Sequence, residues 1–219
     1  MGDIGPGRRN VVERRLKAAC LVLEGAWKID ASVTPTLGRV PTIVIPYRGD
    51  AKRRLPASIR AAAAVAMLGD VVAAALEVGP VLVVTDDVAV VPLGARVVPD
   101  PGQGLSAAVS AGLERVDGHA LVVNADLPCV TAAALGELAA AGLALVEAED
   151  GTTNAMSLPD TAVFAPLYGP GSADRFCAHA PFVSLAIPVL VSDVDAIEDL
   201  ERVMPLAGPR TRALLAVTA

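Results

Sequence analysis

A chain of 219 residues is long enough to bury a substantial hydrophobic core within one ordinary domain. Just over half of the residues (53%) are apolar but only 3% are aromatic, so the core must consist mainly of Ala, Val and Leu, which is typical of parallel strands covered by helices. The net charge of −6 and the shortage of stacking aromatic side chains argue against nucleic acid as a partner. A free nucleotide is compatible with this composition.

The cysteines indicate a reducing compartment. Cys20, Cys129 and Cys177 are odd in number, lie far apart and form no C-x-x-C pair, so neither a disulfide framework nor a zinc site is indicated. We therefore expect a cytoplasmic protein. The most apolar stretch, Ile59 to Leu76, is interrupted by Asp70 and predicts a buried helix rather than a membrane span, so no membrane partner is expected.

Residues 1–39 differ in composition from the rest of the chain. A basic start is followed by an apolar run from Ala18 to Trp27 that Glu24 interrupts. This segment resembles a signal peptide only weakly. A loosely attached amphipathic helix, or an extension translated from a misplaced start codon, explains it better. We assign it no function and place the main domain at residues 40–219.

From Val40 onward, short β-branched runs alternate with alanine-rich segments, which is the pattern of βαβ units. In chain order the sequence predicts a strand at Thr42–Ile45, a helix at Ala57–Leu76, strands at Val81–Thr85 and Arg96–Val98, a helix at Gly104–Arg115, a strand at Ala120–Asn124, a helix at Ala132–Ala141, strands at Ala144–Glu147 and Asn154–Leu158, a helix at Ser172–Ala180, a strand at Val189–Ser192, and helices at Ala196–Val203 and near Thr211–Ala216. This order predicts a single α/β domain with a mostly parallel sheet and helices on both faces. Ligands bind beyond the carboxyl ends of the strands in such a sheet, so the loops there should carry the site.

The loop after the first predicted strand is strongly basic. Between Ile45 and Leu55 it contains the four cationic residues Arg48, Lys52, Arg53 and Arg54. Together with the backbone N–H groups at the start of the next helix, these side chains could neutralise a triphosphate. The alternative is a solvated basic turn. The spacing G-x-x-x-x-G-K-[ST] does not occur here, which excludes a P-loop.

Carboxylates follow two of the predicted strands. Asp126 comes directly after an apolar run and is followed by Pro128, while Asp193 and Asp195 follow Val189–Ser192. If both strands are parallel and central, the three carboxylates converge and could hold one or two Mg²⁺ ions. The alternatives are helix caps at Asp126 and at Asp195.

Three further loops could line substrates. The segments 150–155 and 168–173 carry glycines that let the backbone approach an anion, and Ser172 could cap the helix that follows. The alternative is a pair of tight turns. The loop 99–106 could hold a base or a ribose through its backbone and the Gln103 amide. Neither His119 nor His179 has the Ser or Cys partners of a nucleophilic site, so we expect His119 to be structural.

Taken in order, these motifs resemble one known family. They are IPYRGDAKRRL, NADLP, TTNA, YGPGS, SDVD and GPRTRA, and they span about residues 41–216. The ordered set is similar to the guanylyltransferase family of coenzyme F(420) biosynthesis, whose members act on 2-phospho-L-lactate or phosphoenolpyruvate. The resemblance implies a nucleotide-diphospho-sugar-transferase-like fold and the Mg²⁺-dependent transfer of GMP from GTP to a small phosphorylated acid, with release of pyrophosphate.

The resemblance also implies roles for individual residues. The expected metal ligands are Asp126, Asp193 and Asp195, and the expected catalytic residues are Lys52, Arg54 and Asp126. The expected nucleotide contacts are Pro46, Arg48, Lys52, Arg54, Gln103, Gly104 and Asp126, and the expected acceptor contacts are Thr153 or Asn154, Gly169 and Ser172. Two positions depart from the family pattern: Arg48 stands where relatives often have lysine, and Ser106 replaces an asparagine after Leu105. Selectivity for the base is therefore less firmly implied than the metal chemistry.

Several alternatives stay open at this point. A molybdopterin-type guanylyltransferase or an isoprenoid cytidylyltransferase usually begins with a glycine-rich turn that IPYRGDAKRRL does not match. A nucleotide-binding regulator without turnover would not need two acidic strand ends, and a purely structural interaction protein would need none of these loops. Among phosphoenolpyruvate, 2-phospho-L-lactate and 3-phosphoglycerate, the alanine- and arginine-rich composition favours phosphoenolpyruvate, because it resembles the actinobacterial branch. A homodimer is compatible with the sequence.

Overall fold

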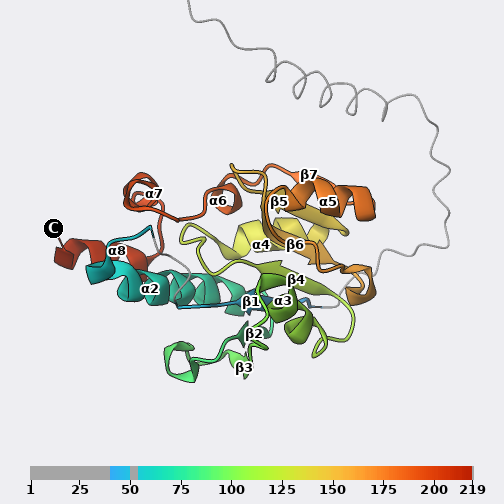
Figure 1. Ribbon diagram of the computed structural model, residues 1–219, viewed down its shortest axis with the longest axis horizontal. Helices are drawn as coiled ribbons and strands as arrows, with labels where there is room; N and C mark the ends of the chain where they lie inside the picture. Colours follow the sequence, from blue (N-terminus) through green and yellow to red (C-terminus); the bar gives the residue numbers. More distant parts are fainter. Residues whose placement is uncertain (1–39, 50–53, 219) are drawn as a thin grey trace, which may run out of the picture. The chain divides into compact units, whose positions relative to one another are not determined.

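The computed structural model of the chain describes residues 40–49 and 54–218, which belong to one compact unit that spans Arg39–Ala219. Its centre is a seven-stranded sheet with the order β3-β2-β1-β4-β6-β5-β7 (Figure 1). The strands are β1 (Thr42–Pro46), β2 (Val81–Val84), β3 (Arg96–Val98), β4 (Ala120–Val123), β5 (Ala144–Glu147), β6 (Thr153–Leu158) and β7 (Val183–Leu185). The predicted extension of residues 1–39 lies outside the described residues, and so do Lys52 and Arg53 of the basic loop.

The sheet is parallel except for one strand. β1 pairs in parallel with β2 and β4, β2 with β3, and β5 with β7, whereas β6 runs antiparallel to both β4 and β5. The four residues of β4 and all six of β6 are buried, as expected for strands in the middle of a covered sheet. The prediction of a mostly parallel sheet is confirmed, and the reversal of β6 is an addition to it.

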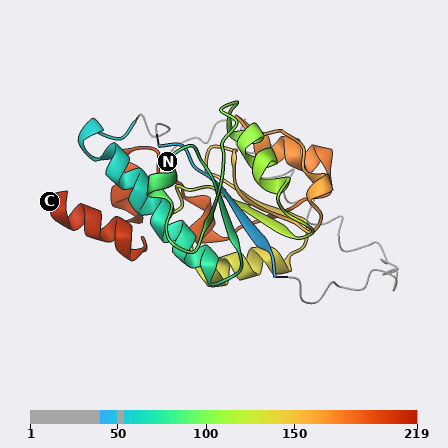
Figure 2. The same ribbon diagram turned by 90° about the horizontal axis from the view of Figure 1, so that it is seen from below.

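Helices cover both faces of the sheet. They are α2 (Ala57–Leu76), α3 (Leu105–Leu113), α4 (Ala132–Ala140), α5 (Ser172–His179), α6 (Pro188–Val191), α7 (Ile197–Val203) and α8 (Pro209–Thr218), with short 3-10 turns at Val88–Val90 and Thr161–Val163. Figure 2 shows the strands between α2 and α4 on one side and α3 and α5 on the other. Two hydrophobic clusters fill the space between the layers, one on each face. The predicted fold class is therefore confirmed.

Helix α2 begins and ends where the sequence predicted. Its 20 residues make it the one helix in the described part of the chain that is long and apolar enough to cross a membrane, with half of the apolar window buried inside the protein. A buried core helix meets the same criteria, and α2 packs its alanine, valine and leucine side chains on the sheet. The carboxylate of Asp70, in the middle of this helix, is buried and has a structural role.

Asp70 anchors the last helix. Its two carboxylate oxygens accept hydrogen bonds from the backbone N–H groups of Arg210 (3.0 Å) and Thr211 (2.9 Å), in the first turn of α8. These amides have no partner within their own helix, and a carboxylate also favours the positive end of the helix dipole. The Arg210 guanidinium donates in return to the carbonyl of Gly69 (2.9 Å). Helix α8 therefore lies beside α2 (Figure 1).

The predicted strand at Val189–Ser192 is wrong, because Val189, Leu190 and Val191 belong to the short helix α6 and Ser192 follows its end. Pro188 stands at the first helical position, where its fixed φ suits a helix, and Leu190 is buried against the core. The edge strand is β7 instead, at Val183–Leu185. Two of its three residues are exposed, so no alternation of apolar side chains marked it in the sequence.

Candidate active site

A cavity of about 240 Å³ opens at the carboxyl ends of β1 and β4. It is lined by Pro46, Tyr47, Arg48, Ala64, Met67, Leu105, Ala108, Asn124, Ala125 and Asp126. Three of the predicted nucleotide contacts, Pro46, Arg48 and Asp126, therefore meet in one place. The first turn of α3 borders the cavity, because Leu105 and Ala108 both line it.

Arg48 is held in the cavity wall by a residue to which the sequence had assigned no role. Its Nε lies 3.4 Å from an oxygen of Asp100, whose side chain is only 3% exposed, while that of Arg48 is 44% exposed. The other oxygen of Asp100 accepts a hydrogen bond from the Gly102 N–H (2.9 Å). One carboxylate thus fixes both the basic side chain and the loop that contains Gln103 and Gly104. Gly104 has a φ of 94° and no atom within 4 Å of where a Cβ would stand, so the loop is open at this point.

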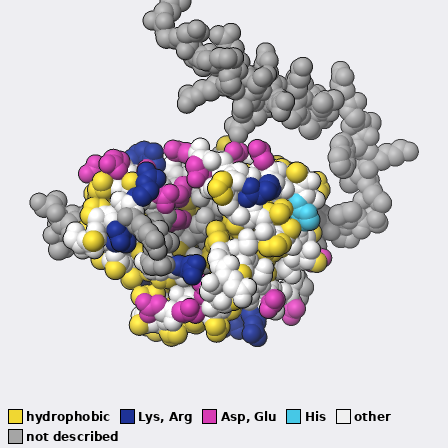
Figure 3. Space-filling view, in the orientation of Figure 1, with side chains coloured by type: hydrophobic (Ala, Val, Ile, Leu, Met, Phe, Trp, Pro, Cys, Tyr) yellow, Lys and Arg dark blue, Asp and Glu magenta, His cyan; other side chains and the backbone are white. Residues whose placement is uncertain are grey.

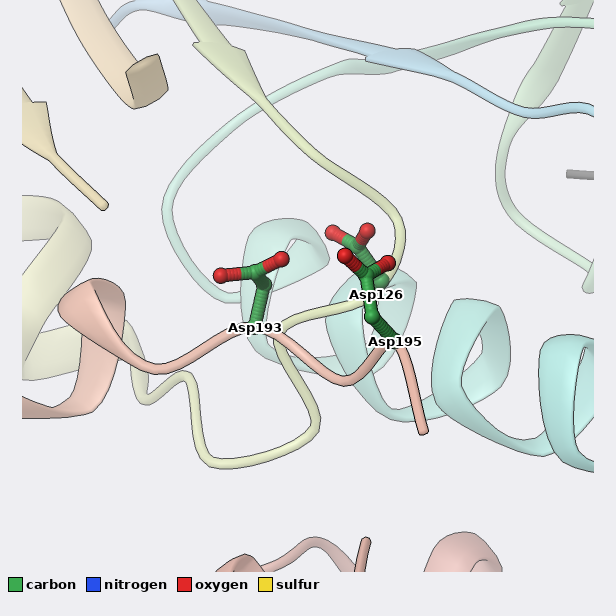
Figure 4. A group of neighbouring side chains, drawn as sticks. All are labelled: Asp126, Asp193 and Asp195. Carbon is green, nitrogen blue, oxygen red and sulfur yellow. The ribbon is translucent and has the colours of Figure 1, made fainter. Parts of the chain in front are cut away.

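The three predicted metal ligands converge. The nearest carboxylate oxygens of Asp126, Asp193 and Asp195 all lie within 4.8 Å of one another, and all three residues are partly buried. Figure 4 shows Asp126 on the loop after β4 and the other two on the segment that leads from α6 to α7. Carboxylate oxygens are the donors that a hard cation such as Mg²⁺ prefers, so this donor set fits such an ion. The predicted convergence of these three carboxylates is present, although the element before Asp193 is a helix and not the predicted strand.

Val194 explains why Asp193 and Asp195 face the same way. Its side chain is fully buried in a cluster with Met67 and Leu200, and its N–H donates to the carbonyl of Asp126 (3.1 Å). Asp193 and Asp195 lie on the side of this segment that faces Asp126 (Figure 4), while the residue between them is turned into the core. The Asp-Val-Asp pattern therefore brings two carboxylates to Asp126 by means of one apolar anchor.

The start of α7 ties this segment down. The carboxylate of Asp199 accepts hydrogen bonds from the N–H groups of Asp195 (3.1 Å) and Ala196 (2.9 Å). Desolvation pushes the pKa of Asp199 upward, but these two hydrogen bonds and the charges of Arg202 and Arg54 outweigh it, so the pKa is lowered. Arg54, from the basic loop, thus acts on the same helix that supports the carboxylates.

Acidic and basic side chains are interspersed over α7 (Figure 3). Arg202 pairs there with Asp199 at 3.2 Å and with Glu149 at 3.4 Å. Glu149, from the loop after β5, also accepts a hydrogen bond from the hydroxyl of Ser192 (3.3 Å). These exposed contacts individually stabilise little. Together they join the α6–α7 segment to the loop that precedes β6.

The two glycine loops predicted to hold the acceptor lie side by side, since the N–H of Ala173 donates to the carbonyl of Gly151 (3.3 Å). Gly169 has a φ of 123°, a conformation that favours glycine. The hydroxyls of Thr153 and Ser172 are 3.0 Å apart, and both residues are almost fully buried. In this structure these two hydroxyls therefore join β6 to the start of α5.

Asn154 is also buried, and its amide bonds to α6 rather than to the glycine loops. The Nδ2 atom donates to the carbonyls of Val191 (2.8 Å) and Leu190 (3.1 Å) and lies 3.5 Å from Asp193 Oδ1. The resemblance offered Thr153 and Asn154 as alternatives for one role. In the structure the side chain of Thr153 contacts Ser172, whereas that of Asn154 contacts α6.

A hydrogen bond links the start of α3, next to the loop 99–106, to the glycine loop 168–173. The hydroxyl of Ser106, in the first turn of α3, accepts from the N–H of Tyr168 (3.2 Å), directly before Gly169. Ser106 is the position that departs from the family pattern. Its short side chain reaches the backbone of the next loop, so the departure has a structural consequence.

Comparison with known proteins identifies the family of this chain. Residues 57–205 match the model of the MobA-like NTP transferase domain. The chain belongs to this family. It is 31% identical over 190 residues to phosphoenolpyruvate guanylyltransferase 2 of Rhodococcus jostii, covering 79% of this chain and 89% of the relative. It is also 34% identical over 199 residues to phosphoenolpyruvate guanylyltransferase of Streptosporangium roseum, covering 80% and 90%, and 32% identical over 189 residues to 2-phospho-L-lactate guanylyltransferase of Methanosphaerula palustris, covering 80% and 89%.

The resemblance to these guanylyltransferases, predicted from the ordered motifs, is confirmed, and the chain is an enzyme of the nucleotidyltransferase class. Solved structures support the fold. A Desulfovibrio desulfuricans G20 protein classed with the nucleotide-diphospho-sugar transferases superimposes with a TM-score of 0.61 at 15% identity, covering 80% of this chain and 94% of that one. A nucleotidyl transferase from Methanothermobacter gives 0.56 at 16% identity, covering 82% and 100%.

Sequence reasoning missed some residues of the cavity. Asp100 lies in the loop 99–106, but the sequence analysis gave it no role. A signal was available, because this acid stands between two prolines after one strand and an arginine follows a strand elsewhere in the same sheet. Tyr47 and Asn124 also line the cavity. Burial raises the pKa of Tyr47, and the Asp87 carboxylate adds to this, so the phenol stays protonated.

Proposed function

We propose that this enzyme transfers GMP from GTP to phosphoenolpyruvate, or to 2-phospho-L-lactate, and releases pyrophosphate, as a step in coenzyme F(420) biosynthesis. The observation that carries the proposal is the convergence of Asp126, Asp193 and Asp195 beside a cavity that also contains Arg48. The names of the relatives support the choice of guanylyl transfer and of the acceptor class.

The reaction requires no side-chain base. A phosphate oxygen of the acceptor attacks the α-phosphorus of GTP in line, a new P–O bond forms, and the bond to the β-phosphate oxygen breaks to release pyrophosphate. An acceptor phosphate is already ionised at neutral pH, so no proton has to be removed from it. Catalysis then consists of positioning two anions and offsetting their repulsion. Two unit charges about 4 Å apart repel by roughly 4 kcal/mol at an effective dielectric constant near 20.

We assign the metal to Asp126, Asp193 and Asp195, with Mg²⁺ as the ion. When bound there, Mg²⁺ would neutralise phosphate charge and orient the reacting oxygens. The protein's own part is to hold the three carboxylates together through the buried Val194 and the hydrogen bonds to Asp199.

The nucleotide is proposed to lie along the cavity. Arg48 and Arg54, with Lys52 outside the described residues, would contact the triphosphate, and Lys52, Arg54 and Asp126 would be the catalytic residues. The amides in the first turn of α3 lack helical partners and favour an anion or a carbonyl oxygen. Gln103 and Gly104 at this turn would then face the ribose or the base.

The acceptor is proposed to bind at the glycine loops. Gly169 would offer its backbone, and Thr153 and Ser172 would set the shape of the loop and contact the acceptor if their mutual hydrogen bond opens. We further propose that the enzyme acts in the cytoplasm and assembles as a homodimer. In keeping with a reducing compartment, Cys129 and Cys177, the two cysteines in the described residues, are free thiols.

A matrix of substrates tests the proposal. Pyrophosphate release should be measured with GTP, ATP and CTP, each combined with phosphoenolpyruvate, 2-phospho-L-lactate and 3-phosphoglycerate in the presence of Mg²⁺. We expect release with GTP and one of the first two acceptors, and ³¹P NMR should show a new diphosphate linkage. Release only with another nucleotide, or GTP binding without release for any acceptor, would overturn the assignment and favour a molybdopterin-type enzyme or a regulator.

A further inference from the structure

The short helix α6 ends directly before the carboxylate segment, and its last carbonyl groups need donors from outside the helix. Asn154 supplies them. Its Nδ2 lies 2.8 Å from the carbonyl oxygen of Val191 and 3.1 Å from that of Leu190, and the residue is only 2% exposed. A side chain of β6 therefore fixes the point in space at which the segment with Asp193 and Asp195 begins.

The same side chain is linked to the loop that carries Asp126. The backbone carbonyl of Asn154 accepts a hydrogen bond from the N–H of Asn124 (3.0 Å). The side-chain Oδ1 of Asn154 also lies 3.5 Å from the Nδ2 of Asn124. Asn124 stands two residues before Asp126. The partners of the Asn154 Nδ2 are all oxygen atoms, so the orientation of this amide is settled by the groups around it.

From this arrangement we propose that Asn154 is a positioning residue of the metal centre, which sets the separation between Asp126 and the pair Asp193 and Asp195. The inference rests on the proposed function, because it concerns the Mg²⁺ site assigned there. It gives Asn154 a role other than the acceptor contact that the family resemblance offered. The Nδ2 lies 3.5 Å from Asp193 Oδ1, so the amide also faces the carboxylate that it positions.

The affinity of a Mg²⁺ site depends strongly on where its ligands are held. Mg²⁺ demands nearly ideal octahedral coordination with short bonds, so a small displacement of one ligand weakens binding. Loss of the Asn154 amide would leave the α6 carbonyls without their donors and free the start of the segment to move. Removing a group that orients metal ligands typically lowers affinity by roughly 10–100-fold.

The test measures metal binding directly. Free Mn²⁺ is titrated into the nucleotide-free protein and followed by electron paramagnetic resonance, for the wild type, Asn154→Ala, and Asn154→Leu, which preserves the volume of the side chain. Ser157→Ala is the matched control. Ser157 lies on the same strand and is equally buried, and its hydroxyl bonds to His119 (3.0 Å), so the control also loses a side-chain hydrogen bond. Strand geometry places it about 10 Å from Asn154.

We expect the Kd for Mn²⁺ to rise by at least tenfold in both Asn154 variants and by less than twofold in Ser157→Ala. At saturating metal, the KM for the acceptor should stay within about twofold of the wild type, whereas a direct acceptor contact would raise it. Folded Asn154 variants with an unchanged Kd for Mn²⁺ would overturn the inference while leaving the proposed function intact. Failure of the wild type itself to bind Mn²⁺ would instead overturn the metal assignment and this inference with it.

Folding is checked by circular dichroism. If both Asn154 variants fail to fold, the wild type provides the test, because the side-chain amide signal of Asn154 can be followed by ¹⁵N NMR during a titration with Mg²⁺. We expect this signal to shift with the same Kd as the backbone amides of Asp193 and Asp195. A signal that stays fixed while those amides move would contradict the inference.

Discussion

The pair formed by Arg48 and Asp100 allows a graded prediction. Asp100→Asn keeps an oxygen that can accept the Gly102 N–H but removes the charge that faces Arg48, whereas Asp100→Ala removes both interactions. If Arg48 contacts the triphosphate, each change should weaken GTP binding through this arginine and this loop. The fold should persist, because neither interaction belongs to the sheet.

The expected magnitude follows from exposure. The Arg48 side chain is 44% exposed, so the charge pair is screened and worth about 1 kcal/mol, the upper end for surface pairs. The hydrogen bond to the Gly102 N–H adds roughly 1 kcal/mol. With about 1.4 kcal/mol for each tenfold change, the Kd for GTP should rise roughly fivefold in Asp100→Asn and roughly thirtyfold in Asp100→Ala.

Isothermal titration calorimetry with GTP and Mg²⁺, in the absence of acceptor, measures these constants. Asp117→Asn is the control, because Asp117 is exposed and lies at the opposite end of the sheet, before the start of β4. Equal affinity of both Asp100 variants and the wild type would refute the reasoning. So would an effect that falls on the KM for the acceptor alone.

Two other features of the structure give predictions about stability. At Gly208 an added Cβ would stand 2.3 Å from Asp70 Cγ, so Gly208→Ala should lower Tm by roughly 2–10 °C. Gly136 lies in the middle of α4 with open space around it, so Gly136→Ala should raise Tm by about 1–4 °C. Differential scanning calorimetry measures both changes, and equal shifts would contradict the account. Burial lowers the pKa of His119 below its ordinary 6.5, so NMR titration should find a lower value in the folded chain. Protonation then favours the unfolded chain, and this contribution to stability should be complete above about pH 6.5 and decline as the pH falls toward the folded-state pKa, a dependence that His119→Gln should remove.

The sequence predicted most of the architecture because its signals were local. Helix α2 begins after Pro56, and its alanine-rich run predicted both ends correctly. The prediction at Val189–Ser192 was wrong because a short apolar run can form either a helical turn or a strand, and only its packing distinguishes the two. The antiparallel direction of β6 was equally beyond local signals, since strand direction depends on pairing with β4 and β5.

The residues of the candidate site also fall into those with a local sequence signal and those without one. Asp126, Asp193 and Asp195 could be found from the sequence because acids that follow apolar runs are conspicuous. Asp100 was conspicuous between its two prolines, but its partner Arg48 lies 52 residues earlier in the chain. The role of Asn154 had no local signal, because its side-chain partners lie 30 or more residues away, Val191 being 37 residues after it.

The most direct test of the central claim is pyrophosphate release by Asp126→Asn compared with the wild type, using GTP, Mg²⁺ and the preferred acceptor. The substitution preserves the size of a side chain that lines the cavity and takes part in the carboxylate cluster, so circular dichroism should show an unchanged fold. We predict that turnover falls by at least about 100-fold, in line with the loss of a group that stabilises charge in the transition state. Full activity in a folded Asp126→Asn protein would contradict the assignment of these carboxylates to catalysis.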